Sequence, residues 1–245
     1  MKTHILFVLD ESGSMQPKAN DVVNGFNRYV QDQKAGTDEC VLSLVKFNTT
    51  KSRVYTCKPI NDAPELSYAT YVPGGSTALL DAVAESIRIG DEEPSDRVIC
   101  VIVTDGEENA SRETSQSQVA AIMKEREDSG KWTFAYLGES PERWSQTMGT
   151  SVNNTMQYNA GNIGSQLDTL SCATVTMRST PMTASANFLS VPATPSNSDA
   201  AKQLGSAGGK IGGPARVAAT TPQQRIETAR KVSRARWDSV TKKGE

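Results

Sequence analysis

The stretch HILFVLD (residues 4–10) is an apolar run that ends at an aspartate. A second run, VICVIV (residues 98–103), precedes Thr104 and Asp105. Strands that are apolar on both faces are typical of the centre of a parallel sheet that helices cover on both sides. The two runs therefore predict two central strands, each with an aspartate at or just beyond its carboxyl end.

Weaker strand patterns and helical patterns alternate along the chain around these two runs. Further strands are expected at residues 41–47, 53–58, 133–137 and 155–158. Helical spacing of apolar residues covers residues 18–33, 78–89, 118–129 and 163–178, and a shorter helix is expected after Pro141. This alternation predicts an α/β domain over residues 1–178, with a doubly wound, mostly parallel open sheet flanked by helices.

The composition changes after this α/β part of the chain. Residues 179–220 are rich in Ser, Thr, Pro and Gly and predict a flexible linker. Thr221 and Pro222 are suited to begin a helix, so we expect a basic helix within residues 221–245.

Charge is distributed unevenly along the chain. The net charge of −2 over 245 residues gives no overall field that would favour nucleic acid or a membrane surface. Residues 202–245, however, contain 10 Lys and Arg against 3 Asp and Glu, whereas residues 1–201 contain 16 against 25. An acidic body therefore precedes a basic tail.

Several classes of protein are disfavoured by the cysteines, the amino terminus and the histidine count. The four cysteines form no CxxC pair, which argues against a zinc ribbon or a redox site. The first apolar run is too short for a signal peptide or a membrane span, so we expect a cytoplasmic protein that contacts no membrane. The single histidine, His4, argues against Ser/His and Cys/His catalysis and is expected to be an ordinary residue at the edge of the first strand.

Oxygen-bearing side chains follow the two central strands and precede the second helical pattern. Asp10, Ser12 and Ser14 lie in the turn after the first run, Asp105 follows the second, and Thr77 lies just before the helix. Because ligands collect at the carboxyl ends of parallel strands, we expect these five side chains to meet. Two carboxylates and three hydroxyls suit Mg²⁺, with Mn²⁺ as an alternative, and suit zinc or copper poorly. The bound ion would stay electrophilic and attract an external carboxylate or phosphate.

Three motifs resemble those of a known family. DESGSM (residues 10–15), GGSTALLDA (residues 74–82) and VTDGEEN (residues 103–109) resemble the von Willebrand factor type A domain with its metal-ion-dependent adhesion site (MIDAS). The resemblance covers roughly residues 1–178 and implies that the five residues above hold the ion, directly or through water. It also implies that an acidic residue of a partner protein completes the coordination shell. The chain looks more like the intracellular bacterial and phage members than like secreted adhesion modules.

Other carboxylates lie close to the expected site in the sequence. Glu11, Glu107 and Glu108 would widen its acidic mouth or hold a second ion, but surface carboxylates are usually solvated, and we expect that here. Asp81, in the first turn of its helix, is placed either to brace the metal loop or to interact with the helix dipole.

The basic tail allows two interpretations. Its cations and its tryptophan are suited to bind nucleic-acid phosphates and stack on a base, although a solvated helix is the more common meaning of such a charge run. The residues concerned are Arg225, Arg230, Lys231, Arg234, Arg236 and Trp237.

The sequence as a whole predicts a non-enzymatic module that binds an acidic residue of a partner protein through Mg²⁺. One alternative is a Mg²⁺-dependent phosphohydrolase, which would need a phosphate-stabilising cation near its nucleophile. The metal loops offer no Lys or Arg closer than Lys18, Arg97 and Arg112, which lie beyond the metal residues. The other alternative is a nucleic-acid-binding protein that acts through its basic tail.

Overall fold

The computed structural model of the chain describes residues 1–158, 161–180 and 188–189. The chain divides into two compact units, Met1–Thr194 and Pro195–Glu245. All the described residues belong to the first unit. The expected basic helix, with its candidate nucleic-acid contacts, and most of the expected linker lie outside the described residues.

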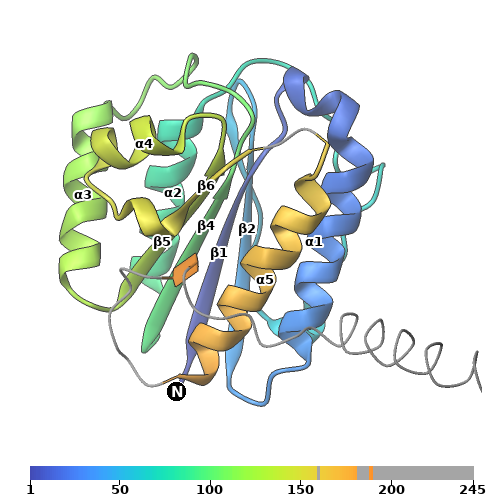
Figure 1. Cartoon of the computed structure of the whole chain (residues 1–245), viewed down its shortest axis with the longest axis vertical. Helices are drawn as coiled ribbons and strands as arrows, with labels where there is room; N and C mark the ends of the chain where they lie inside the picture. Colours follow the sequence, from blue (N-terminus) through green and yellow to red (C-terminus); the bar gives the residue numbers. More distant parts are fainter. Residues whose placement is uncertain (159–160, 181–187, 190–245) are drawn as a thin grey trace, which may run out of the picture. The chain divides into compact units, whose positions relative to one another are not determined.

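A six-stranded sheet forms the centre of the first unit (Figure 1). Its strand order is β3-β2-β1-β4-β5-β6. β1 pairs in parallel with β2 and β4, and only β3 runs antiparallel to its neighbour among the strand pairs described. The strands are β1 (Thr3–Asp10), β2 (Cys40–Phe47), β3 (Lys51–Pro59), β4 (Arg97–Val103), β5 (Trp132–Gly138) and β6 (Thr155–Gln157). The predicted doubly wound α/β architecture is confirmed.

Helices cover both faces of the sheet, with α1 and α5 on one side and α2, α3 and α4 on the other (Figure 1). They are α1 (Ala19–Lys34), α2 (Leu79–Glu92), α3 (Gln116–Asp128), α4 (Pro141–Met148) and α5 (Ile163–Ser179). Short 3-10 turns occupy Gly13–Lys18, Ile60–Asp62 and Val152–Asn154. Within the described part of the chain, no helix has the length and apolar character needed to cross a bilayer.

The first apolar run forms a strand with both faces buried. Ile5, Phe7 and Leu9 lie in the core beneath α1 and α5, whereas Leu6 and Val8 lie in the core beneath α2 and α3. All eight residues of β1 are buried. Alternate side chains of a strand point to opposite faces, so a central strand must be apolar throughout.

His4 is the second residue of β1, near the start of the strand, and its side chain is more deeply buried than expected for an ordinary residue there. The imidazole is completely buried, and its Nε2 atom lies 2.8 Å from the Ser43 hydroxyl of β2. Burial lowers the pKa of His4 to about 4, because the charged form loses its hydration.

We expect His4 to destabilise the fold as the pH falls from 7 to 5. An unfolded histidine has a pKa of 6.5, so between pH 6.5 and 4 the unfolded chain binds a proton that the folded chain does not. The free energy of unfolding should fall through this window, by about 2 kcal/mol at pH 5. Denaturant unfolding at each pH measures the slope, and His4→Gln should remove the histidine's share of it. An NMR titration that places the pKa of this single histidine above 6 would contradict the expectation.

The core includes a residue from beyond the predicted domain boundary at 178. Phe188 is completely buried in the cluster that α1 and α5 cover, and its backbone N–H donates to Asn154 Oδ1 at 2.8 Å. The first compact unit correspondingly runs to Thr194. A domain of residues 1–178 therefore omits part of its own core, because the Ser- and Thr-rich composition around Phe188 conceals one deeply buried aromatic residue.

Candidate metal centre

The site lies at the point of the sheet where the strand order reverses. β1 pairs with β2 on one side and β4 on the other, and the chain leaves β1 and β4 at the same edge. Asp10 ends β1 and is fully buried, whereas Asp105 lies two residues beyond β4 and is 3% exposed. Open α/β sheets bind ligands in this crevice, since loops from adjacent strands diverge there.

Hydrogen bonds join the first loop to both aspartates. The backbone N–H of Ser12 donates to Asp10 Oδ1 at 2.7 Å, which folds the turn back over the end of β1. The Ser12 and Ser14 hydroxyls lie 3.1 Å apart, and Ser14 donates to Asp105 Oδ1 at 2.5 Å. The DxSxS spacing therefore places alternate hydroxyls toward one point between the two strand ends.

Thr77 reaches the same point from the loop before α2. Its backbone N–H donates to Asn109 Oδ1 at 2.9 Å, and its carbonyl accepts from the N–H groups of Asn109 and Ala110 at 3.0 and 3.2 Å. A Cβ atom at Gly106 would lie 3.3 Å from Thr77 Oγ1 and 3.7 Å from Ser14 Oγ. Glycine thus permits the close approach of these loops. The structure brings together all five residues that the sequence singled out.

The two aspartates are buried close to each other, and this environment disfavours the charged form of Asp10. Burial is the main cause that raises the pKa of Asp10, and the negative charge of Asp105 adds to it. Hydrogen bonds from Thr104 and Ser12 oppose this rise, with Thr104 Oγ1 donating to Asp10 Oδ2 at 2.6 Å. A bound cation would relieve the repulsion between the two carboxylates.

Lys18 lies at the site, which corrects its expected position beyond the metal residues. It ends the 3-10 turn that carries Ser14, and its ammonium forms an ion pair with Asp105 Oδ2. The same nitrogen lies 4.5 Å from the centre of the Tyr158 ring. Sequence spacing alone does not show this contact, because Lys18 and Asp105 are 87 residues apart and meet only in the folded chain.

Two of the three neighbouring glutamates are bonded rather than solvated. Glu11 pairs with Lys46 at 2.7 Å and accepts from the Val72 N–H at 2.7 Å. Glu108 accepts from four donors, namely the N–H groups of Leu80, Ala110 and Ser111 and the Ser111 hydroxyl. Glu107 is exposed as expected and pairs with Arg143 at the surface. Glu11 and Glu108 therefore serve to hold the loops of the site.

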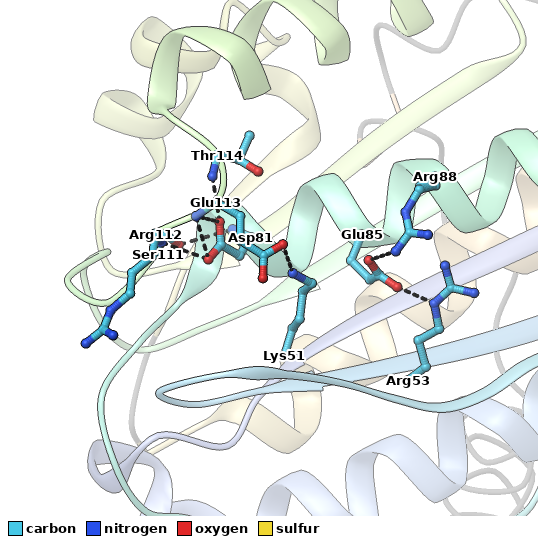
Figure 2. Close-up of polar contacts among 9 residues, drawn as sticks. All are labelled: Lys51, Arg53, Asp81, Glu85, Arg88, Ser111, Arg112, Glu113 and Thr114. Atoms are coloured by element: carbon cyan, nitrogen blue, oxygen red, sulfur yellow. Dashed lines mark hydrogen bonds and ion pairs between the residues drawn. The ribbon is translucent and has the colours of Figure 1, made fainter.

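Asp81 fastens the loop after β4 to the start of α2 (Figure 2). Its carboxylate accepts from the backbone N–H groups of Arg112, Glu113 and Thr114 at 2.9, 3.1 and 2.9 Å. Its own N–H donates to the Ser111 hydroxyl at 3.1 Å. Because that loop also carries Asp105 and α2 follows Thr77, Asp81 links two of the three loops of the site.

A cavity of about 260 Å³ lies beside the site, and Gly106, which follows Asp105, is among its lining residues. Leu79, Tyr136 and Trp144 contribute apolar surface to its lining, and Glu107 and Arg143 contribute charged groups. The Tyr136 and Trp144 rings stack there with centroids 4.5 Å apart. This cavity provides apolar contact area next to the loop that carries Asp105.

The donor set suits a hard divalent cation. Two carboxylates and three hydroxyls from three loops offer oxygen alone, as Mg²⁺ and Mn²⁺ prefer. Among the described residues, no three His, Cys, Asp or Glu side chains gather into a metal-binding group, and this site contains two carboxylates. A MIDAS-type arrangement relies on hydroxyls for the remaining ligands, so the residues present fit such an ion.

Comparisons with known proteins identify the fold. The sequence matches no protein-family model and no curated protein. The vWF domain of the type V pili tip protein Mfa5 from Porphyromonas gingivalis has a TM-score of 0.54 at 10% identity, over 73% of this chain and 96% of that one. The PilB minor pilin from Streptococcus sanguinis has a TM-score of 0.54 at 13% identity, over 74% of this chain and 64% of that one.

A third similar structure is described with a bound metal. Proximal thread matrix protein 1 from the mussel byssus, described with a zinc occupied MIDAS motif, has a TM-score of 0.51 at 15% identity, over 68% of this chain and 44% of that one. The chain thus spans less than two thirds of the PilB and mussel chains. The described part of the chain has the fold of a von Willebrand factor type A domain.

Proposed function

We propose that this chain is a protein-binding module in which Mg²⁺, or Mn²⁺ in its place, holds an acidic residue of a partner protein. The five proposed ligands are Asp10, Ser12, Ser14, Thr77 and Asp105. The observation that carries the proposal is their meeting at the strand-order reversal, where hydrogen bonds already join the loops. The mussel protein, with its zinc occupied MIDAS motif, has the same fold and supports a metal at this place.

A carboxylate is the partner group that this site favours. Asp10 and Asp105 nearly balance the charge of a divalent ion, and the other proposed ligands are neutral hydroxyls. A coordination position of the ion therefore remains for an external anion. Ser14 is exposed, which leaves this side of the site open to solvent. The cavity that Gly106 helps to line has both apolar and charged walls and gives a protein partner further contact area beside the ion. We propose a cytoplasmic location, in keeping with the free thiols of Cys40, Cys57 and Cys100.

Thr77→Ala tests the site with the metal ion as the probe. The variant deletes one hydroxyl ligand and no charge, so we expect Mg²⁺ and Mn²⁺ affinity to fall about tenfold in calorimetry of the full chain. Thr77→Ser keeps the hydroxyl and should retain the affinity of the parent chain. Equal binding by all three proteins would remove Thr77 from the site. Absence of Mg²⁺ and Mn²⁺ binding by both the parent chain and Lys18→Met, which removes the cation at Asp105, would overturn the proposed function.

Partner binding should depend on the same ion. Proteins captured by the full chain in the presence of Mg²⁺ should be released by a chelator, because two bare aspartates then face the partner's carboxylate. Capture that withstands excess chelator, or that the Thr77→Ala variant leaves unchanged, would place the contact surface elsewhere.

One observation favours the second candidate, a Mg²⁺-dependent phosphohydrolase, and another argues against it. Lys18 supplies a cation at Asp105, where a phosphate would need it. Asp10 would be the nucleophile, yet it is fully buried and both its oxygens accept hydrogen bonds. A buried, bonded carboxylate is poorly placed to attack phosphorus. Hydrolysis of a generic phosphate ester that Asp10→Asn abolishes would favour the enzyme over the binding module.

A further inference from the structure

The side chain of Lys18 provides the site with a cation of its own. Its ammonium pairs with Asp105 Oδ2 while the Ser14 hydroxyl donates to Asp105 Oδ1, so one short turn bonds both oxygens of that carboxylate. The carboxylate is fully buried, and the Lys18 side chain is only 15% exposed. The face of the Tyr158 ring lies against the ammonium and favours a positive charge there.

The remaining charges around Lys18 show why this contact matters. Asp10 and Asp105 are the two carboxylates of the site, and among the described residues Lys18 is the one cation that forms an ion pair with either. Within the described part of the chain, the donors recorded to the Asp10 carboxylate are the Ser12 N–H and the Thr104 hydroxyl, which carry no charge. The ammonium therefore offsets part of the repulsion between the two aspartates. A divalent ion that approaches Asp105 meets this positive charge at close range.

We propose that Lys18 is an internal competitor of the metal, which stabilises the metal-free site and lowers its affinity for divalent cations. The inference rests on the proposed function of the site and concerns its regulation. Binding of the ion and release of the ammonium are then coupled, and such couplings between charges are reciprocal. Because the ammonium is tethered within the turn that carries Ser14, metal binding should shift this turn as well as the Lys18 side chain.

Lys18→Met removes the charge and keeps most of the apolar stem. Calorimetry of the full-length variant should show Mg²⁺ affinity higher than that of the parent chain by about tenfold, a typical size for such coupling. Without metal, the thermal midpoint of Lys18→Met should lie below that of the parent chain, and saturating Mg²⁺ should reduce this difference in thermal midpoint. Lys18→Arg retains a cation and should keep the affinity of the parent chain within about threefold.

Lys46→Met is the matched control. Lys46 and Glu11 form an ion pair in which both side chains are 13% exposed, and Glu11 adjoins Asp10 in the chain without being a proposed ligand. This variant should lose thermal stability with and without Mg²⁺ and should not raise Mg²⁺ affinity, since the charge lost is not at a ligand.

The outcomes separate this inference from the proposed function. Tighter Mg²⁺ binding by Lys18→Met but not by Lys46→Met supports the inference, including the case in which the parent chain binds too weakly to measure. Equal or weaker binding by Lys18→Met beside a parent chain that binds Mg²⁺ overturns the inference and leaves the metal site standing. Failure of the parent chain and of Lys18→Met to bind Mg²⁺ or Mn²⁺ overturns both.

Discussion

Replacement of Asp10 by asparagine should lower Mg²⁺ affinity by at least about 100-fold while the fold persists. The change removes one of two negative charges at the ion, and an electrostatic loss of this kind is large in a buried site. The asparagine carbonyl can still accept from the Ser12 N–H. The amide nitrogen of the asparagine can donate to Thr104 Oγ1. The Thr104 hydroxyl can then donate to the Gly106 carbonyl oxygen, which lies 3.1 Å away.

The metal-free Asp10→Asn protein should be at least as stable as the parent chain. Burial raises the pKa of Asp10, which means that the fold disfavours its charge, and asparagine removes that charge. Glu107→Gln is the control, since Glu107 lies two residues from Asp105 but is exposed and paired with Arg143. It should change Mg²⁺ affinity by no more than about twofold. A similar loss in both variants would mean that general acidity, rather than a ligand at Asp10, governs binding.

The sheet and the five proposed ligands could be predicted because their signals are local. The two-sided burial of β1 and β4 requires continuous apolar runs, and the residue that ends such a run lies at the sheet edge whatever the rest of the chain does. Asp10 and Asp105 follow from that rule, and Ser12 and Ser14 follow from the alternation of side chains in the turn. Their gathering is confirmed, whereas metal binding remains a prediction.

The contacts that the sequence did not reveal depend on partners distant in the chain. From the sequence, Glu11 is expected to be a surface carboxylate. Its partner Lys46 lies 35 residues later in the chain, and only the fold brings the two side chains together. Phe188 lies in a stretch whose composition predicts a linker, and only the structure shows that its side chain is buried in the core. Lys18 is close in sequence to Ser12 and Ser14, but its partner Asp105 lies 87 residues later, and the conformation of the 3-10 turn directs the ammonium there. Composition and spacing carry no information on such pairings.

Asp81→Asn should weaken both the fold and the metal site, although Asp81 is not a ligand. An amide offers one acceptor oxygen in place of two, so backbone N–H groups of residues 112–114 lose their partners. We expect the free energy of unfolding to fall by about 2–3 kcal/mol in denaturant unfolding, as for other lost hydrogen bonds to a charged group. Mg²⁺ affinity should fall about tenfold, because the loop that carries Asp105 is no longer held against the helix that follows Thr77.

Glu85→Gln distinguishes bracing of the site from stability in general. Glu85 lies one turn further along α2, is 6% exposed against 7% for Asp81, and pairs with Arg53 and Arg88 instead of with the metal loop (Figure 2). Its substitution removes a comparably buried carboxylate from the same helix, so stability should fall while Mg²⁺ affinity stays within about twofold. If Asp81→Asn and Glu85→Gln weaken Mg²⁺ binding equally, metal affinity depends on the stability of α2 as a whole. If neither variant weakens it, Thr77 and Asp105 keep their places without Asp81.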